Sequence, residues 1–247
     1  MPESVSGTFL EHLDELRRRL WVAVLALSAA SCVSLFYADK LLEWVMRPAR
    51  TEIASLYFFT PSDAFAVKIK LALLSGFLVS SPVILGQFWL FVSPAMHAHE
   101  RKALPPFIAF TSALFLTGAA FSFFKVLPMT LHFLIGMQTE GLRPLLSVNE
   151  YLSFVSLVVI AFGIAFDLPV FVLILVWTGV LNTQVLNQFQ RQVIVLIFIA
   201  AAVLTPGPDV SSQLMLAIPL LVLYEVSVLL AFFASALRRR KRQKALA

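Results

Sequence analysis

The stretch YLSFVSLVVIAFGIAFDLPVFVLILVWTGVL, residues 151–181, decides the fold class of this chain. It carries a single charged side chain, Asp167, and is otherwise uncharged and mostly apolar. An α-helix rises about 1.5 Å per residue, so it needs about 20 apolar residues to cross the roughly 30 Å hydrocarbon core of a bilayer. The stretch exceeds that length, and we therefore expect it to form a membrane-spanning helix.

The composition of the whole chain also indicates a membrane protein. Hydrophobic residues make up 60% of the 247 residues, charged residues make up 13%, and the mean hydropathy is +0.88. Soluble domains are about half apolar and a quarter charged, because a soluble core of this size cannot bury so many large apolar side chains. The single cysteine, Cys32, excludes a disulfide framework and a multi-cysteine metal site.

Five further apolar segments bring the expected number of spans to six, joined by connections rich in Pro, Gly and charge. The six expected spans are residues 20–36, 71–91, 107–124 with an extension to 137, 151–181, 193–204 and 214–237. The first is interpreted as an uncleaved span rather than a signal peptide, because many apolar segments follow it. The fifth covers only about 18 Å. It therefore predicts a locally thinned bilayer, unless 188–192 and Thr205 extend the helix through protein contacts.

The distribution of Lys and Arg predicts the orientation of these spans. If both termini lie inside, most of the 19 basic residues fall in inner segments. These inner residues are Arg17, Arg18, Arg19, Arg101, Lys102, Arg191 and the basic residues of the RRRKRQK tail. The positive-inside rule then places both termini in the cytoplasm, which requires an even number of spans.

We expect one membrane domain over residues 1–247. It would comprise a cytoplasmic amphipathic segment at 1–19, a six-span bundle at 20–237 and a basic tail at 238–247. The tail is interpreted as an anchor beside anionic lipid rather than a nucleic-acid-binding segment.

The segment FLEHLDELRRRL, residues 9–20, predicts a short amphipathic helix that leads into the first span. Its apolar residues recur at helical spacing: Phe9, Leu13, Leu16 and Leu20. Two acidic-then-basic pairs stand four residues apart in the favourable order, Asp14 with Arg18 and Glu15 with Arg19. Taken alone, the segment is most simply explained as an amphipathic lead-in stabilised by its own ion pairs.

The connection FVSPAMHAHERKALPP, residues 91–106, predicts a short rigid loop on the cytoplasmic side. Prolines at 94, 105 and 106 bracket it, and Glu100 is exposed between them. His97 and His99 lack a third partner at metal-ligand spacing, so we predict no metal site here.

Two acidic residues lie within expected spans. Asp167 is followed by Pro169, and Glu225 lies in the last span. An ionisable group at membrane depth is costly and is by default a functional hypothesis, and the carbonyl freed by Pro169 must be satisfied in a hydrated or protein-lined concavity. For Glu225 a protonated carboxyl that is hydrogen-bonded within the bundle remains an equal alternative.

Four motifs, taken together, resemble the TatC family. They are HLDELRRR at 12–19, F-x-x-P-x-x-x-x-x-E-R at 91–101, F-x-x-P at 166–169, and TPGPDVSSQ followed by LAIP at 205–219. They occur in the family's order and spacing from about residue 9 to the tail. The resemblance implies an all-α integral membrane protein whose six helices form a concave bundle in the bacterial cytoplasmic (inner) membrane.

The resemblance also implies a function and a set of site residues. TatC-like proteins bind the twin-arginine signal peptides of folded cargo at the cytoplasmic face, and Glu15, Arg17, Phe91 and Glu100 match the family's recognition region. They organise single-span partners, here TatA/TatB-like subunits, and self-association is expected. The family uses the proton gradient and is not an enzyme, and we expect no cofactor and no nucleic-acid partner.

Further positions match the family outside the recognition region. Asp167 matches a buried acid in the fourth span, Pro48 matches a proline in the first outer loop, and Asp209 and Gln213 match a polar pair in the last outer loop. The expected buried polar, partner-docking positions are Asp167, Asp209, Gln213 and Glu225, and Pro48 is an expected structural or functional loop position. The family's buried acid is usually glutamate, so Asp167 has a shorter reach, and the TPGPD loop departs in length from the family pattern.

The chemistry of the residues agrees with this assignment. Carboxylates are the best readers of paired arginines, because a guanidinium forms two parallel charge-assisted bonds with them. Six helices of about 10 Å diameter cannot enclose a hole for a folded domain, so the chain must recruit other subunits or weaken the bilayer. No Walker-type GxxxxGK[ST] is present, which gives no support for nucleotide hydrolysis.

Two other functions remain as alternatives. A proton-coupled small-solute transporter would use Asp167 and Glu225 as its relay, but the halves 1–120 and 121–247 show no convincing internal repeat. An intramembrane enzyme would need a nucleophile–base or metal constellation at depth, and His132 is the only histidine near a span.

Overall fold

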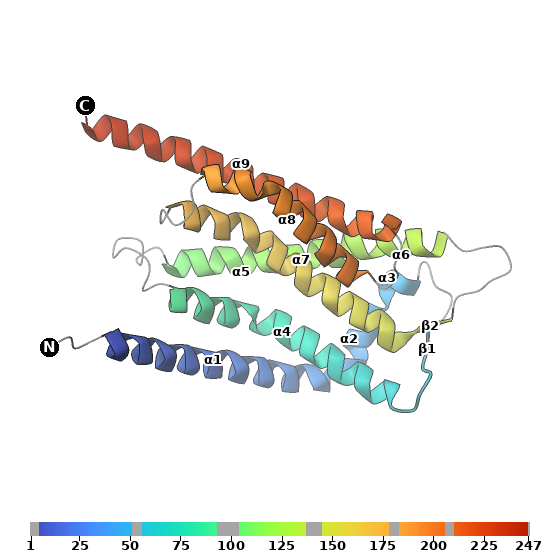
Figure 1. Ribbon diagram of the computed structural model, residues 1–247. Helices are drawn as coiled ribbons and strands as arrows, with labels where there is room; N and C mark the ends of the chain where they lie inside the picture. Colours follow the sequence, from blue (N-terminus) through green and yellow to red (C-terminus); the bar gives the residue numbers. More distant parts are fainter. Residues whose placement is uncertain are drawn as a thin grey trace. The chain divides into compact units, whose positions relative to one another are not determined.

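The computed structural model describes residues 5–50, 56–92, 104–136, 145–177, 183–205 and 210–246 (Figure 1). Within these ranges the chain is almost entirely helical, which confirms the predicted fold class. The chain divides into two compact units, which are described separately below. The first unit consists of Met1–Val45 and Thr60–Ala113, and the second of Met46–Phe59 and Leu114–Ala247.

The first unit is built on two long helices that lie side by side, α1 (Val5–Phe36) and α4 (Asp63–Val92). Small residues allow the two backbones to approach closely. A Cβ atom added at Gly76 of α4 would lie 2.7 Å from the Cα atom of Ser31 in α1, so only glycine fits at this crossing. The short helix α2 (Ala38–Val45) also packs on α4.

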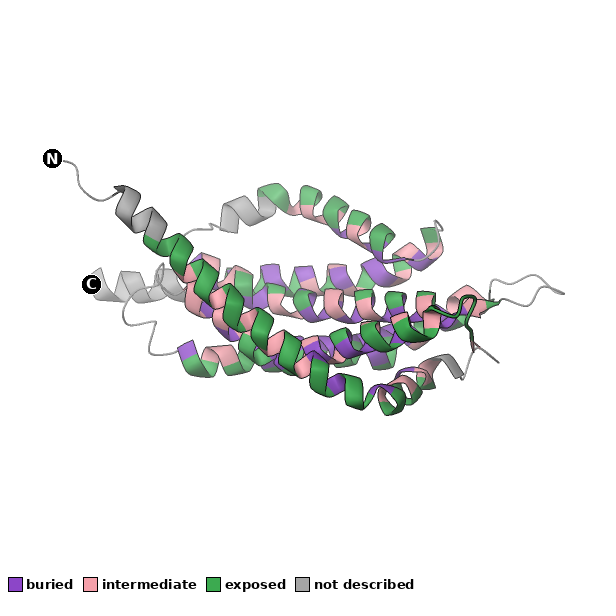
Figure 2. Ribbon diagram, turned by 90° about the horizontal axis from the view of Figure 1, so that it is seen from below, coloured by how far each residue is buried: buried purple, intermediate pink, exposed green. Residues whose placement is uncertain are grey.

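The predicted separate amphipathic helix at the N-terminus is wrong, because α1 continues from Val5 to Phe36 without a break. No Pro or Gly interrupts the sequence between Phe9 and Phe36, so nothing ends the helix before the apolar run begins. The stripe expected to rest on a membrane surface is exposed at Leu13, Leu16 and Leu20. Figure 2 shows that exposed positions run along much of this helix.

The first outer connection, residues 37–63, is more ordered than the sequence suggested. It contains α2, the single helical turn α3 (Arg47–Arg50) and the strand β1 (Leu56–Tyr57). β1 pairs in parallel with β2 (Leu146–Ser147), and both strands belong to the second unit. Two-residue strands carry too little hydrophobic pattern to be predicted.

The second unit is built on α7 (Val148–Trp177), α8 (Thr183–Leu204) and α9 (Val210–Leu246), with α9 packed against both of the others. The largest fully buried side chains of this unit are Phe115, Leu127, Leu152, Phe162 and Leu216. Many other large apolar residues are exposed, as expected for helices whose solvent is lipid.

The third span follows the longer of its two predicted boundaries. α5 (Leu104–Phe121), the π-helical turn η3 (Ser122–Val126) and α6 (Leu127–Gly136) follow one another without a gap, which confirms the predicted extension to within one residue. In the π turn, the Leu127 N–H donates to the Ser122 carbonyl five residues earlier. Pro128 follows at once and offers no N–H to the preceding turn, so we attribute the wider turn to it.

Five helices within the described ranges are long and apolar enough to cross a membrane. They are Glu11–Phe36, Asp63–Val92, Leu104–Gly136, Val148–Val176 and Val210–Phe233. The expected fifth span has only a short apolar part, Gln188–Leu204. The helix itself begins at Thr183 and has 22 residues, or about 33 Å, so the expected extension through 188–192 is confirmed, whereas Thr205 lies just beyond the helix end.

Candidate functional site

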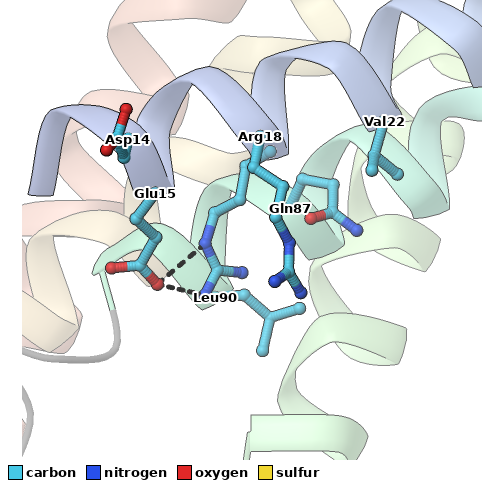
Figure 3. Close-up of a pocket in the computed structure, with 7 residues that line it drawn as sticks. Asp14, Glu15, Arg18, Val22, Gln87 and Leu90 are labelled. Atoms are coloured by element: carbon cyan, nitrogen blue, oxygen red, sulfur yellow. Dashed lines mark hydrogen bonds and ion pairs between the residues drawn. The ribbon is translucent and has the colours of Figure 1, made fainter. Parts of the chain in front are cut away.

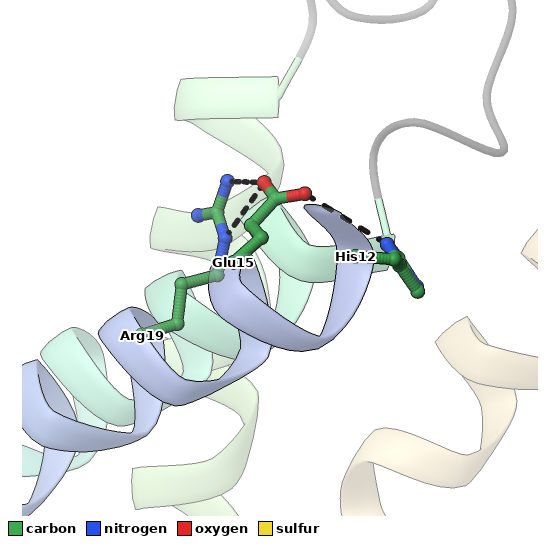
Figure 4. A network of polar contacts seen from close by, with 3 residues as sticks. All are labelled: His12, Glu15 and Arg19. Carbon is green, nitrogen blue, oxygen red and sulfur yellow. Dashed lines mark hydrogen bonds and ion pairs between the residues drawn. The ribbon is translucent and has the colours of Figure 1, made fainter. Parts of the chain in front are cut away.

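The first half of α1 presents a carboxylate, Glu15, that is held by residues of its own helix (Figure 4). The Arg19 Nε atom donates a hydrogen bond of 3.1 Å to Glu15 Oε1, and the Arg19 Nη2 atom bonds the same oxygen. The His12 Nδ1 atom lies 3.8 Å from the other oxygen, Glu15 Oε2. Residues three and four apart share a helix face. The predicted pair of Glu15 and Arg19 is therefore confirmed.

The Glu15 carboxyl is ionised and partly accessible. It precedes the apolar run that starts at Leu20, so it lies outside the hydrophobic part of the helix. The Arg19 guanidinium beside it favours the charged form of the carboxyl. The side chain is 33% exposed, which leaves room for a cationic ligand to reach it.

Phe91, near the C-terminal end of α4, lies beside this group. Its ring stacks on the His12 ring, with 4.5 Å between the centroids and 22° between the planes. The structure therefore brings Glu15 and Phe91, which were predicted from separate motifs, into one cluster, and His12 connects them. Sequence reasoning missed His12 as a site residue, although its place three residues before Glu15 was a usable signal.

A pocket of about 530 Å³ opens beside Glu15, between α1 and α4 (Figure 3). Its lining is mixed: Val22 and Leu90 are apolar, and Gln87 adds an amide that no sequence motif singled out. The lining residues are Asp14, Glu15, Arg18, Arg19, Val22, Gln87 and Leu90. A pocket with two carboxylates, two guanidinium groups and an apolar part suits a ligand that is cationic at one place and apolar at another.

Other predicted members of this region are placed differently. Arg17 is exposed and does not line the pocket. Asp14 and Arg18 line it, but no ion pair joins them in the described part of the chain, so that predicted pair is not formed. Exposed pairs gain little because both side chains lose freedom. Glu100 lies outside the described residues.

The second unit contains Asp167, near the middle of α7 and two residues before the in-helix Pro169. The residue is half-buried, and its Oδ1 atom is fully buried without a hydrogen-bond partner among the described residues. A buried oxygen without a donor costs about 1–3 kcal/mol. Asp167 is therefore a position in this unit at which an added hydrogen-bond donor would stabilise the protein.

Glu225 was predicted to be buried, and this prediction is wrong because the side chain is exposed. The inward face of α9 is formed here by Tyr224, Ser227 and Val228, so Glu225 points to the outside. Its Oε1 atom accepts a hydrogen bond of 3.0 Å from Gln190 Nε2 of α8. Gln190 was not predicted, because nothing in the sequence aligns it with a residue 35 positions away.

The remaining predicted positions lie at loops and helix ends. Gln213, in the first turn of α9, donates a hydrogen bond of 2.7 Å to the Phe198 carbonyl oxygen of α8. Pro48 lies in α3 and is half-buried. Asp209 lies outside the described residues.

No group of three or more His, Cys, Asp or Glu side chains in the described ranges is arranged to hold a metal ion. His97 and His99, which were judged poor metal ligands from their spacing, lie outside those ranges.

Comparisons with known proteins agree on one family. A family profile described as Sec-independent protein translocase protein (TatC) matches residues 11–219. The chain is 39% identical to Sec-independent protein translocase protein TatC of Aquifex aeolicus (strain VF5), over 95% of this chain and 98% of that protein. It is 37% identical to the protein of the same name from Carboxydothermus hydrogenoformans, over 92% of this chain and 93% of that protein.

A solved structure is similar as well. It is described as the crystal structure of the twin-arginine translocase receptor TatC, and the match has a TM-score of 0.83 and 39% sequence identity. The match covers 91% of this chain and 99% of that chain. These similarities give no support to the solute-transporter alternative.

Proposed function

Because this chain belongs to the TatC family, and is thus a non-enzymatic, multi-pass membrane component of a twin-arginine protein translocase, we propose that it receives the twin-arginine signal peptides of folded cargo at the cytoplasmic face. The observation that carries this proposal is the Glu15 carboxylate. It is partly exposed and forms an ion pair with the guanidinium group of Arg19. A carboxylate that binds its own arginine in this geometry can bind the arginine of a leader peptide in the same way.

The surroundings of Glu15 suit the rest of such a leader. A twin-arginine signal peptide carries an apolar segment after its arginines, and the pocket beside Glu15 offers Val22 and Leu90 as apolar lining. We assign the second arginine to Glu100, which follows Phe91 by nine positions in the sequence. Arg17 is exposed on α1, the helix that also carries Glu15. In this assignment it lies outside the pocket and holds in place either the leader or the segment that carries Glu100.

We further propose the topology predicted from the sequence, with six spans and both termini in the cytoplasm of a bacterial inner membrane. The five long apolar helices supply five of the spans, and α8 supplies the sixth, because its 22 residues reach about 33 Å although only part of it is apolar. The basic run at the C-terminal end of α9 and the arginines before the first apolar run then lie on the same, inner side.

The second unit would bind the partner subunits. Asp167, Gln213 and Glu225 are polar groups on membrane-spanning helices, and polar groups promote helix association in lipid. Single-span TatA/TatB-like helices carrying donors at matching depth would bind there, with Asp209 and Pro48 at the outer ends. The assembly, which includes further copies of this chain, would move cargo at the expense of the proton gradient.

The test is binding of a fluorescent twin-arginine leader peptide to the full chain in lipid nanodiscs. Glu15→Gln and Glu100→Gln should each weaken binding by roughly tenfold or more, because each removes a charge-assisted bond. Glu11→Gln is the matched control: it removes the same charge one turn earlier on α1, outside the pocket, and it should bind like the unmodified chain.

The size-exclusion profile of each variant shows whether it is folded. If the folded Glu15→Gln and Glu100→Gln variants bind the leader as tightly as the control, the proposed recognition site is wrong. The assay in cells is the location of a folded reporter with a twin-arginine leader after deletion of this protein. Normal export without a paralogue would contradict the function itself.

A further inference from the structure

The two oxygens of the Glu15 carboxylate have different partners, and this difference suggests how a ligand enters. Oε1 is occupied by the Arg19 guanidinium, whereas Oε2 faces His12 (Figure 4). We propose that Arg19 is a resident guanidinium that the leader's arginine displaces from Oε1, while His12 stays in place and positions the carboxylate. This inference rests on the function proposed above and adds the mechanism of recognition.

Arg19 has the geometry of a ligand that is already bound. Its Nε and Nη2 atoms both bond Glu15 Oε1, so one guanidinium already occupies this oxygen and leaves Oε2 to other partners. Its side chain is only 20% exposed, so it fills space in the pocket that a leader would need. A leader arginine therefore cannot take the same oxygen until Arg19 leaves it.

The exchange is energetically accessible because the resident pair is weak. A pair four residues apart on one helix, with its two side chains 20% and 33% exposed, forms with an equilibrium constant of about two to five. A ligand that binds only the open form then loses affinity by the open fraction, a factor of about three to six. The bond to a leader arginine replaces the bond to Arg19, so the net gain comes from the remaining contacts of the leader.

His12 is suited to hold Glu15 during the exchange. Its ring is stacked on Phe91 of α4, so it is fixed from the neighbouring helix rather than from α1 alone. Its Nδ1 atom lies 3.8 Å from Glu15 Oε2, beyond hydrogen-bond distance but facing the oxygen that Arg19 does not bond. His12 therefore acts through Glu15 and not on the leader itself.

The test for Arg19 is the sign of a change in affinity. In the full chain in nanodiscs, Arg19→Gln should tighten binding of the leader peptide about three- to sixfold, because Glu15 becomes permanently open. Arg18→Gln removes the same charge from the same pocket but breaks no bond to Glu15, so its gain should be smaller. Binding by Arg19→Gln that is equal to or weaker than that of the unmodified chain would overturn the exchange.

The test for His12 uses two variants that separate its ring from its nitrogen. His12→Phe keeps a ring to stack on Phe91 but has no nitrogen to face Glu15, and it should weaken leader binding several-fold. His12→Gln keeps an N–H donor without the ring and should restore part of that loss. Because His12 acts through Glu15, the double variant His12→Phe with Glu15→Gln should bind no more weakly than Glu15→Gln alone.

The outcomes separate this inference from the proposed function. Additive losses in the double variant would show that His12 does not act through Glu15, and they would overturn its positioning role. If Glu15→Gln abolishes binding while Arg19→Gln fails to tighten it, only the exchange is wrong. If Glu15→Gln has no effect, the recognition site itself is wrong.

Discussion

Replacing Gly118 by alanine tests the packing that places the helix of Asp167. Gly118 lies in α5 against α7, and a Cβ atom there would come within 2.6 Å of the Phe162 carbonyl oxygen and 2.7 Å of Phe166 Cβ. The first of these atoms belongs to the backbone and cannot rotate away. Alanine would therefore push α5 and α7 apart. One of the two contacts is at Phe166, the residue directly before Asp167.

The size of the effect follows from two opposing contributions. Overpacking of this kind costs about 1–3 kcal/mol, whereas exchange of glycine for alanine inside a helix gains roughly 0.5–1 kcal/mol. Gly136→Ala at the C-terminal residue of α6 is the comparison without overpacking, because nothing among the described residues lies within 4 Å of a Cβ atom there. Gly118→Ala should thus be less stable than Gly136→Ala by about 1–3 kcal/mol, or about 2–12 °C in melting temperature.

The first assay is thermal unfolding of both variants in the same detergent. The second assay measures how much partner subunit each variant retains. Gly118→Ala should also lose partner subunits more readily, since α7 carries Asp167 next to Phe166. If Gly118→Ala melts at or above the temperature of Gly136→Ala, the close approach of α5 and α7 does not limit stability, and the reasoning fails.

Three other substitutions give separate tests. Asp167→Leu should raise the free energy of unfolding by about 1–3 kcal/mol, because it removes a buried oxygen without a donor. The same substitution should reduce copurification of partner subunits. A lower melting temperature would mean that this oxygen has a donor in the membrane. Asp39→Asn breaks the exposed pair with Lys68 and should cost less than about 1 kcal/mol, with no cost left in high salt, as measured by denaturant unfolding. Gln213→Leu removes the bond to the Phe198 carbonyl and should cost about 0.5–1.5 kcal/mol in the same assay, so an unchanged midpoint would contradict that bond's contribution.

The long helices could be predicted because the bilayer leaves the backbone few alternatives. A segment such as 151–181 must satisfy all its N–H and C=O groups internally, so length and apolarity alone indicate a helix. The structure places α7 at Val148–Trp177, close to that prediction. The pair of Glu15 and Arg19 was predictable for a similar reason, since a spacing of four is a local property of one helix.

The features that were missed depend on contacts between distant parts of the chain. The stack of His12 on Phe91 joins residues from two helices, and the bond from Gln190 to Glu225 does the same, so neither follows from a local pattern. The exposure of Glu225 depends on which face of α9 packs inward, and an apolar span with a weak pattern around its circumference does not reveal that face.

The three acids of the candidate sites are held in different ways, and this decides what each can offer a partner. Glu15 is bonded by Arg19, and Glu225 accepts a bond from Gln190, so a ligand at either position must compete with a bond already made. Asp167 makes no such bond through its buried Oδ1 atom. A donor that reaches Asp167 would therefore gain the full cost of that oxygen, about 1–3 kcal/mol. Because the atom is buried, such a donor must enter between helices rather than rest on them, and we therefore expect docking at Asp167 to move α7, whereas docking at Glu225 would leave the helices in place.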